Sequence, residues 1–304
     1  AQAIEKQQIQ GAVRSNSYSS ITLARNGDML GYTYFTVDDG TTTFEISDWT
    51  QLIESVQLVI GGQVIDEQTS EFSQYVALDM LAKNTSKGSL GPGGRSSWFY
   101  PLRFFFCEAV ESAIPMCALQ YQEVELRIRW GPLAGNYTWE CHSNYYFLDA
   151  MERAQIAGQT VDMLIYQIQS TPPSYERTQE LTFNHPVKFI ASSNIFSGST
   201  LTAPNNRIKL SVNGVELAPY KWARPNFLDV PAYYHTTSVS SPDVFLHSFA
   251  NDTSSLQPTG TLNFSRVSSF KIHSESRNLI DKIYACSYNI LTIQNGIGAL
   301  RFAN

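Results

Sequence analysis

Hydrophobic and polar residues alternate along much of this chain. Between Glu123 and Trp130 the even-numbered positions are apolar, and the odd-numbered positions carry Glu or Arg. Because successive side chains of a strand point to opposite faces, this pattern predicts a half-buried antiparallel strand. Residues 30–36 and 208–212 show the same period of two. Strand periodicity therefore dominates over helical periodicity, which indicates a chain built mainly of strands.

Turn and helix signals subdivide this pattern. Asn26-Gly27 and Asn213-Gly214 each stand between strand-like runs, and because both residue types tolerate positive φ, both pairs are predicted to be hairpin tips. Helical spacing is scarce, and residues 70–82 and 149–155 are the two candidate helices. Many short strands joined by loops rich in Gly, Ser, Thr and Pro predict an all-β fold of sandwiches rather than βαβ units.

A short internal similarity bears on the number of domains, because 304 residues fit either one large domain or two of about 150 residues. Residues 58–65 and 210–217 both combine a strand, a glycine turn and a second strand, and Gly62 and Gly214 are 152 positions apart. Strand–turn–strand is also the commonest pattern of any β protein. Chance recurrence and true duplication therefore both remain open at this point.

Composition narrows the function classes. Charged residues make up 16% of the chain and hydrophobic residues 43%, against a typical charged share of about 25%. Apolar and neutral polar side chains must therefore cover much of the surface, and such a surface is suited to burial by partners. The net charge of −6 offers no cationic field for a polyanion, which argues against a chain that binds nucleic acid along its whole length.

The ends and the middle of the chain carry further signals. No stretch is long and apolar enough for a membrane-spanning helix, and residues 1–16 are polar rather than arranged as a signal peptide, so we expect a soluble, unsecreted chain. Residues 1–16 show no strand periodicity, and we expect them to form an N-terminal arm. Residues 169–178 contain Pro172-Pro173, which cannot donate to a strand ladder, and are predicted to be an extended linker.

Cysteine and histidine spacing argues against local metal sites. No two cysteines form a CxxC pair, and no two histidines form HxH or HExxH. We therefore expect reduced, mostly buried thiols, no metal and no other cofactor. The residues concerned are Cys107, Cys117, Cys141, Cys286, His142, His185, His235, His247 and His273.

Three other motifs each have a structural and a functional interpretation. The aromatic run from Trp98 to Phe106 is either a buried strand, which is favoured, or a carbohydrate platform on an exposed sheet. The run from Gly91 to Gly94 lacks the GK[ST] ending of a phosphate-binding loop and is predicted to be an ordinary loop. Four N-glycosylation sequons are present, of which the first three are candidate sites in loop-like stretches and the fourth falls in a core-like strand: Asn84, Asn136, Asn251 and Asn263.

Several segments of this chain share the signatures of one known family. The segment from Gln257 to Arg266, together with residues 247–250, 183–188 and 288–300, closely resembles the major capsid proteins of nucleocytoplasmic large DNA viruses. Residues 25–28, 54–66, 100–106 and 118–124 resemble the first half of the family, in its order. The resemblance extends from about residue 20 to the C-terminus. Its signature residues, for which a structural role is favoured, are Asn26, Gly27, Gly61, Gly62, Asn184, His185, Pro186, Gln257, Pro258, Gly260, Asn263, Phe264, Ser265 and Arg266.

The resemblance implies a double jelly roll, which consists of two consecutive eight-stranded antiparallel sandwiches with short helices in the loops. We expect an N-terminal arm at 1–16, a first jelly roll at 17–168, the linker at 169–178 and a second jelly roll at 179–304. The chain resembles a short-loop member of the family. The resemblance also implies a pseudo-hexameric homotrimer that tiles the icosahedral shell of a double-stranded DNA virus, since six similar sandwiches in a ring tile as a hexamer does.

The implied partners are other copies of this chain together with penton and minor capsid proteins. The resemblance implies a place in the virion shell next to an internal viral membrane, with no direct contact to nucleic acid and with assembly in the cytoplasm of the infected host cell. Gln257 or Arg266 could alternatively make a contact between subunits, because Arg is enriched at interfaces. His185 has no nucleophile motif beside it, so no enzyme is predicted. A jelly-roll binding module, such as a lectin-like or receptor-binding virion protein, is the second function class.

Overall fold

The computed structural model describes residues 1–77, 80–81, 85–90, 97–193, 200–236 and 244–304, and strands dominate in them. The chain divides into two compact units. Unit 1 comprises Ala1–Gln74, Leu90–Gln167 and Asn289–Asn304, and unit 2 comprises Tyr75–Ser89 and Ile168–Tyr288.

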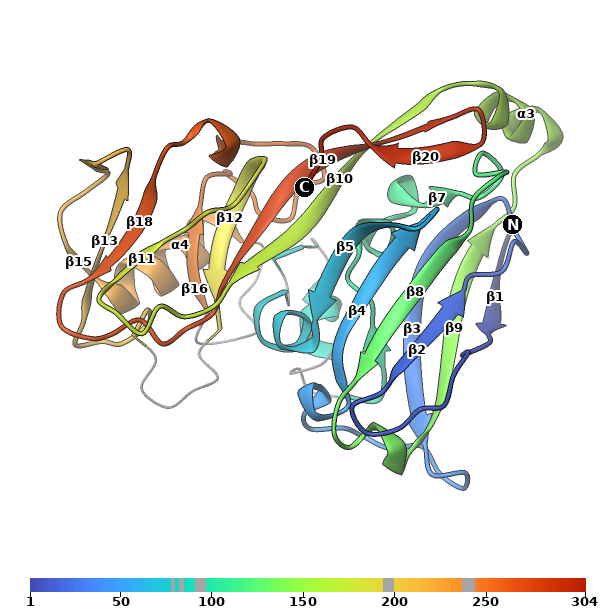
Figure 1. Cartoon of the computed structure of the whole chain (residues 1–304), viewed down its shortest axis with the longest axis horizontal. Helices are drawn as coiled ribbons and strands as arrows, with labels where there is room; N and C mark the ends of the chain where they lie inside the picture. Colours follow the sequence, from blue (N-terminus) through green and yellow to red (C-terminus); the bar gives the residue numbers. More distant parts are fainter. Residues whose placement is uncertain (78–79, 82–84, 91–96, 194–199, 237–243) are drawn as a thin grey trace. The chain divides into compact units, whose positions relative to one another are not determined.

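Unit 1 contains two antiparallel sheets (Figure 1). In the first sheet the strand order is β1 (Gln2–Gln7), β9 (Thr138–Tyr146), β3 (Met29–Asp38) and β6 (Tyr100–Pro101), and β7 (Ile114–Pro115) also pairs with β3. In the second sheet the order is β2 (Tyr18–Thr22), β8 (Val124–Trp130), β4 (Ile53–Ile60) and β5 (Gln63–Thr69).

Aromatic side chains from both sheets form the core of unit 1. Phe35 of β3 and Trp139 of β9 come from the first sheet, and Trp130 of β8 comes from the second. The ring centroid of Trp130 lies 6.2 Å from that of Phe35 and 4.6 Å from that of Trp139. The indole N–H of Trp130 donates to Ser19 Oγ at 2.7 Å, so this polar group is satisfied inside the core. The two sheets are therefore the layers of one sandwich.

Two further antiparallel sheets include the strands of unit 2. One has the order β10 (Val161–Thr171), β19 (Ile283–Gln294), β12 (Pro186–Ser192) and β16 (Phe245–Ser248), with β17 (Leu262–Asn263) on β12 and β20 (Ile297–Leu300) on β19. The other has the order β11 (Thr178–Glu180), β18 (Phe270–Ser274), β13 (Arg207–Val212) and β14 (Val215–Glu216), with β15 (Lys221–Trp222) on β13. Val187 and Phe245 of the first of these sheets share one buried cluster with Ile208 and Phe270 of the second, so unit 2 is also a sandwich.

The helices are short and lie in the connections between strands. The α-helices are α1 (Thr85–Leu90), α2 (Phe105–Glu108), α3 (Ala150–Gly158) and α4 (Val230–His235). The 3₁₀ and π turns are η1 (Trp49–Gln51), η2 (Phe72–Ala77), η3 (Val110–Ser112), η4 (Ala134–Asn136), η5 (Pro225–Asp229) and η6 (Phe264–Arg266).

Most local predictions are confirmed. The alternating segments form β8, β3 and β13, and β8 alternates between buried and more exposed positions as its sequence predicts. Asn213 and Gly214 have φ of 50° and 79° between the paired residues Val212 and Val215, which is the predicted hairpin. Asp149 accepts hydrogen bonds from Met151 N and Glu152 N and starts the predicted helix, which is α3.

Three local predictions are wrong. Asn26-Gly27 is not a hairpin tip, because β2 and β3 on either side belong to different sheets. Residues 2–7 form a strand, β1, although their sequence does not alternate. The aromatic run from Trp98 to Phe106 is mostly buried as expected, but it forms only the two-residue β6 and the start of α2 rather than one strand.

Two other predictions are tested only in part. The helix expected over residues 70–82 is present as a helical turn that includes η2, while residues 78–79 and 82–84 lie outside the described residues. The run from Gly91 to Gly94 also lies outside them. The predicted linker 169–178 begins inside β10, which continues to Thr171, and the domain limits stay predictions.

Candidate functional site

Two signature segments come together in unit 2. β17 pairs with the start of β12, with Pro186 opposite Asn263. The N–H of Phe264 donates to the carbonyl of His185 at 3.0 Å, and the N–H of His185 donates to Ser265 Oγ at 2.9 Å. We call residues 184–186 and 263–266 the signature junction. Segments that lie about 80 residues apart in the sequence are thus joined by backbone hydrogen bonds.

Three residues of the signature junction meet local structural demands. His185 has a φ of 67° and is buried, a conformation that ordinary residues adopt rarely. The side chain of Asn263 accepts a hydrogen bond from Ser265 N and caps η6. Phe264 is buried, and its ring centroid lies 5.0 Å from that of Phe270. The junction therefore orders the turn and anchors it in the core of unit 2.

Asn184 connects the junction to β10 within unit 2. Its N–H donates to Gln169 Oε1 at 2.9 Å, and Gln169 Nε2 donates back to the carbonyl of Asn184 at 2.8 Å. Gln169 Nε2 also donates to Ser287 Oγ at 2.9 Å. This reciprocal amide contact satisfies backbone groups that no strand ladder reaches.

The loop before the junction combines one constrained glycine with exposed residues. Gly260 has a φ of 145°, and a Cβ at this position would lie 2.4 Å from the carbonyl oxygen of Phe249. Only glycine fits such a close approach. Gln257, Pro258 and Arg266 are exposed, so the structure leaves them accessible to another molecule.

The signature residues of the first half belong to unit 1 and do not join the junction. A Cβ on Gly27 would lie 2.6 Å from Tyr145 Cβ, so this glycine allows close packing rather than a turn. Gly61 and Gly62 have φ of 56° and 81° and form the tight turn between β4 and β5. Asn26 is exposed.

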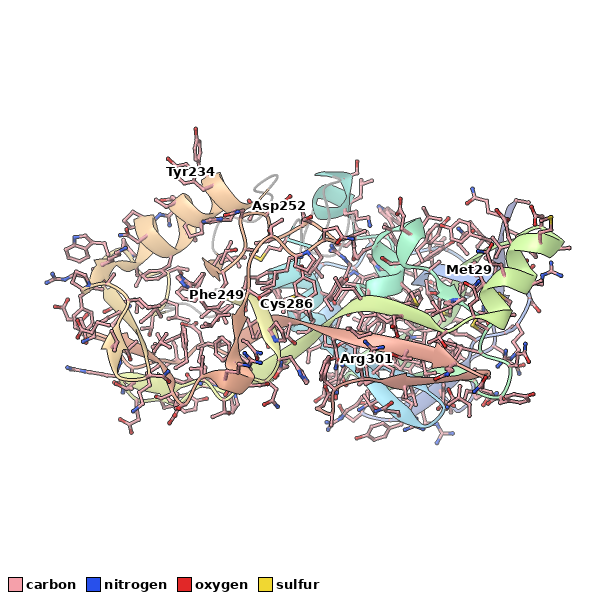
Figure 2. The ribbon with its side chains drawn as sticks, turned by 90° about the horizontal axis from the view of Figure 1, so that it is seen from above. Met29, Tyr234, Phe249, Asp252, Cys286 and Arg301 are labelled. Carbon is pink, nitrogen blue, oxygen red and sulfur yellow. The ribbon has the colours of Figure 1, made fainter. Side chains whose placement is uncertain are left out.

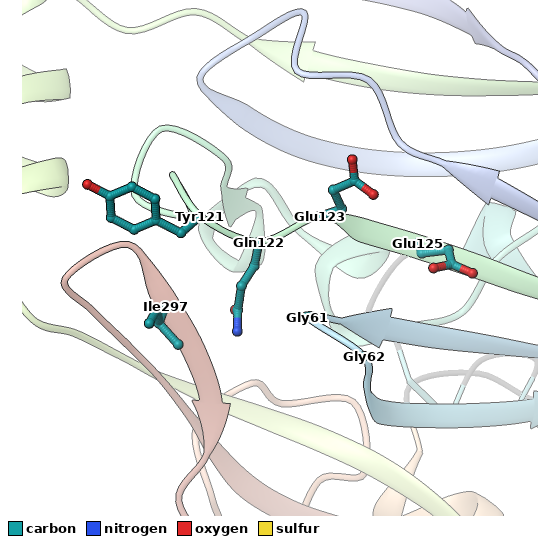
Figure 3. Close-up of a pocket in the computed structure, with 7 residues that line it drawn as sticks. All are labelled: Gly61, Gly62, Tyr121, Gln122, Glu123, Glu125 and Ile297. Carbon is teal, nitrogen blue, oxygen red and sulfur yellow. The ribbon is translucent and has the colours of Figure 1, made fainter.

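An open pocket of about 460 Å³ lies in unit 1 beside the Gly61-Gly62 turn. Figure 3 shows Gln122 reaching toward this turn between Tyr121 and Glu123. Gln122 Oε1 accepts a hydrogen bond from Gly298 N at 2.8 Å, and Glu125 forms an ion pair with Arg127 at 3.0 Å. The lining residues are Gly61, Gly62, Tyr121, Gln122, Glu123, Glu125 and Ile297. The ionisable side chains among them are those of Tyr121, Glu123 and Glu125.

Buried ionisable groups in unit 2 have structural partners. Burial lowers the pKa of Lys188, whose Nζ donates to the carbonyl of Ser255 at 2.9 Å and lies 5.5 Å from the Tyr288 ring centroid. Burial, with smaller contributions from the nearby His235 and Lys221, lowers the pKa of His247 to about 4. His247 is therefore neutral at physiological pH and packs as a ring rather than as a cation.

A buried ion pair serves the same structural purpose in unit 1. Arg103 Nε lies 2.6 Å from Glu108 Oε1, and both side chains are almost inaccessible to water. The carbonyl of Arg103 also accepts hydrogen bonds from Gln68 Nε2 at 2.9 Å and from the Tyr166 hydroxyl at 2.6 Å. Pairing offsets the desolvation cost of burying these two charges, whereas removal of one partner would leave the other charge buried and uncompensated.

Most of the cysteine thiols are buried. All four cysteines are free, as predicted, and Cys117 is the most accessible of them. No group of three or more His, Cys, Asp or Glu residues in the described ranges could hold a metal ion. Within these ranges, no helix has the length and apolar character that a membrane span requires.

The candidate glycosylation sites differ in their surroundings. Asn136 and Asn251 are exposed, whereas Asn263 is half-buried and uses its side-chain oxygen to cap η6. Asn84 lies outside the described residues. Exposure is compatible with a sequon at Asn136 or Asn251, and the capping role argues against one at Asn263.

Sequence reasoning missed a run of exposed apolar side chains in unit 2. Val215, Leu217 and Trp222 are 68%, 53% and 51% exposed, and Tyr233 and Tyr234 on α4 are 79% and 69% exposed. Figure 2 shows Tyr234 projecting clear of the ribbon. The strand alternation at 208–212 could not reveal this surface, because the exposed residues follow that strand in a turn, in short edge strands and in α4.

Comparisons with known proteins give consistent matches along the chain. Residues 1–166 match a family model described as the N-terminus of the major capsid protein, and residues 152–299 match one described as the large eukaryotic DNA virus major capsid protein. The major capsid protein of Pyramimonas orientalis virus is 27% identical, over 93% of this chain and 85% of the relative. That of Paramecium bursaria Chlorella virus 1 is 26% identical, over 98% of this chain and 90% of the relative.

Solved structures show the same architecture. A quasi-atomic model of the PBCV-1 virus capsid matches with a TM-score of 0.79 and 23% identity, over 100% of this chain and 97% of the other chain. The Faustovirus major capsid protein matches with a TM-score of 0.68 and 12% identity, over 97% of this chain and 90% of the other. The fold shared by these chains is the double jelly roll that the sequence predicts.

Proposed function

Because the chain belongs to the major capsid proteins of large eukaryotic DNA viruses, we propose that it assembles as a homotrimer with a pseudo-hexameric outline. The chain is a structural protein of the virion shell and not an enzyme. This membership decides between the two function classes left open by the sequence, in favour of the capsid subunit over the binding module.

One observation carries the proposal: a single chain contains two sandwich units and matches the two capsid models in succession. Three such chains supply six similar sandwiches. A closed ring of six similar units packs on a surface as a hexamer does, although its true symmetry is threefold. We propose that these trimers tile the icosahedral shell.

The energetics of such an assembly divide between two kinds of contact. A permanent subunit contact commonly buries ~2,000 to 5,000 Å², and apolar burial contributes ~25 cal/mol per Å² before the costs of ordering and association are subtracted. Contacts between trimers can each be weak, because many weak contacts in a closed shell act together. Weak contacts also allow wrongly placed trimers to leave.

The remaining partners belong to the same proposal. Penton and minor capsid proteins would close and brace the shell, and an internal membrane would lie next to it without being spanned by this chain. We expect no direct contact between this chain and nucleic acid, because a net charge of −6 does not attract a polyanion. Assembly in the host cytoplasm completes the scheme.

Light scattering coupled to size exclusion tests the trimer. The expected mass is three times the 34.1 kDa of one chain at micromolar concentration. Electron microscopy of the same sample should show compact particles with a hexagonal outline. A monomer at all concentrations up to tens of micromolar would contradict the proposal.

A further inference from the structure

Charge is distributed very unevenly along the chain. Residues 26–82 contain ten Asp and Glu residues and no Lys, Arg or His, although the whole chain carries a net charge of only −6. The remainder of the chain is therefore net positive. An asymmetry of this size creates local fields that the total charge does not reveal.

One part of this acidic stretch is an ordered surface loop in unit 1. We call residues 38–48 the acidic loop; they include Asp38, Asp39, Glu45 and Asp48, and Asp39 and Glu45 are exposed. Phe44 packs against Tyr137 with ring centroids 5.5 Å apart. The loop thus presents carboxylates from a fixed position.

Hydrogen bonds within the loop also keep the exposed Asp39 ionised. Asp39 Oδ1 accepts hydrogen bonds from Thr41 Oγ1 at 2.6 Å, Thr41 N at 2.8 Å and Thr42 N at 3.0 Å. These bonds, the one from the Thr41 hydroxyl first, lower the pKa of Asp39 to about 2. Asp39 is therefore ionised throughout the pH range in which proteins are normally stable.

A surface of the opposite sign lies in unit 2. We call residues 207–224, which contain β13, β14 and β15, the cationic edge. This segment contains four basic residues and one acidic residue, Glu216. The basic residues are Arg207, Lys209, Lys221 and Arg224. The Arg207 guanidinium lies 5.0 Å from the Trp222 ring centroid, and Lys209 Nζ lies 4.7 Å from that of Tyr220.

Nearby carboxylates neutralise only part of this charge. Arg207 pairs with Glu275 at 2.6 Å, and Lys209 pairs with Glu216 at 2.6 Å. Lys221 is exposed beside Trp222 in β15, so a positive excess remains next to an aromatic ring.

The cationic edge also has the apolar composition of an interface. Val215, Leu217 and Trp222 are each more than half exposed within a span of eight residues. Aromatic and Arg residues are enriched in the centres of protein interfaces, and clustered exposed apolar side chains mark sites that partners cover. Exposed apolar side chains in a segment with a basic excess, such as Trp222 beside Lys221, favour an acidic protein surface as the partner.

We propose that the acidic loop of one copy docks on the cationic edge of the next copy in the trimer. This inference rests on the proposed trimer and names the contact that would hold it together. The two surfaces differ, so the contact is heterologous, and a heterologous contact that closes after three copies gives a ring. Opposite charge steers the two surfaces together and disfavours the pairing of like surfaces.

Charge reversal on each surface tests the contact. Glu45 and Lys221 are both exposed, so Glu45→Lys and Lys221→Glu should leave each chain folded. In either variant every ring contact places like charges together, and the concentration at which half of the trimer dissociates should rise about tenfold or more. The double variant restores opposite charges at every contact and should recover most of the lost affinity.

Matched controls change the same charges elsewhere. Glu111→Lys and Arg14→Glu alter exposed residues outside both surfaces and should leave trimer dissociation unchanged within about twofold. Sodium chloride should weaken the wild-type trimer, because salt screens the attraction between opposite charges. Salt also screens the repulsion in the single variants, but neither variant should form a more stable trimer than wild type does. Trp222→Ala should weaken the trimer at all salt concentrations.

The outcomes separate this inference from the proposed function. A wild-type trimer that neither single reversal weakens, or a double variant no better than the singles, would overturn the docking of the acidic loop on the cationic edge and leave the trimer standing. A wild-type chain that stays monomeric would overturn the trimer itself.

Discussion

Gly260 shows how one residue of the capsid signature is fixed by geometry. Its φ of 145° lies in a region that L side chains rarely adopt, and a Cβ would lie 2.4 Å from the carbonyl oxygen of Phe249. The sequence favoured a structural role for Pro258 and Gly260, and both residue types are typical of turns. The close approach to Phe249 could not be predicted, because it depends on where β16 ends in space.

We predict that Gly260→Ala lowers the free energy of unfolding by about 1–3 kcal/mol from backbone strain, with a further loss from the clash with Phe249. Chemical denaturation at a fixed protein concentration measures this. Gly158→Ala is the matched control, because nothing lies within 4 Å of its added Cβ and the residue is helical. The control should be neutral or stabilising by up to about 1 kcal/mol. Equal losses in both variants would contradict the structural role of Gly260.

At the scale of elements, periodic strands were predictable and irregular ones were not. The sequence of β8 alternates between apolar and charged residues, because one face of the strand is buried and the other is exposed to water. β1 is an edge strand whose burial alternates, but its sequence does not follow this alternation: the apolar Ile4 lies on the exposed face, and the polar Gln7 is buried. Its place depends on pairing with β9, which no local signal in residues 2–7 announces.

The turn at Asn26-Gly27 failed for a related reason. An Asn-Gly pair permits positive φ, but here Gly27 meets a demand for space beside Tyr145 as the chain crosses from one sheet to the other. A local sequence motif indicates which backbone conformations are allowed. Tertiary contacts then determine which of these conformations the chain adopts.

The start of α3 depends on Asp28, which lies far away in the sequence. Asp28 Oδ2 accepts a hydrogen bond from Leu148 N at 2.8 Å, and Asp28 Oδ1 lies 2.7 Å from Arg153 Nε. Burial acts to raise the pKa of Asp28, but the bond from Leu148 and the Arg153 guanidinium together outweigh it and hold the pKa below its usual value. Asp28 thus ties α3 to the connection between β2 and β3.

We predict that Asp28→Asn destabilises unit 1 at pH 7 by about 1 kcal/mol or less, because Arg153 is half exposed and water screens the pair. A carboxyl group with a lowered folded-state pKa stabilises above its unfolded value, about 3.9, and loses that contribution as the pH falls through the folded value. The difference between wild type and variant should therefore shrink between about pH 5 and pH 2, as followed by thermal unfolding.

Asp162→Asn is the control for Asp28→Asn. Asp162 forms a similar pair with Arg301 at 2.7 Å, but both side chains are more than 40% exposed. Its replacement should have a smaller effect at pH 7. A difference for Asp28→Asn that stays constant down to pH 2 would show that the carboxylate charge does not matter for the attachment of α3.

At the scale of the whole molecule, sequence signatures identified the family, but averages concealed the surfaces. The signature residues predicted the fold because they meet local demands of turn, cap and core, as Asn263 and Phe264 do in the signature junction. The net charge of −6 indicated no cationic field over the chain as a whole. The acidic loop and the cationic edge cancel in that total, so only their separate placement reveals a complementary pair.

If the trimer forms, its stability must depend on concentration. Association stabilises the folded chains and not the unfolded ones, so the unfolding equilibrium shifts with the amount of protein. Taking an unfolding enthalpy of about 0.7 kcal/mol per residue, we predict that Tm rises by roughly 1–2 °C for each tenfold increase in concentration.

Scanning calorimetry from about one to one hundred micromolar chain measures this slope, with light scattering on the same samples to fix the starting mass. Lys221→Glu provides the internal comparison: at concentrations where the variant is monomeric and wild type is trimeric, its Tm should be independent of concentration. A wild-type Tm that stays constant across this range would mean that the chain unfolds as a monomer. In that case the stability of a shell would have to come from contacts formed only during assembly.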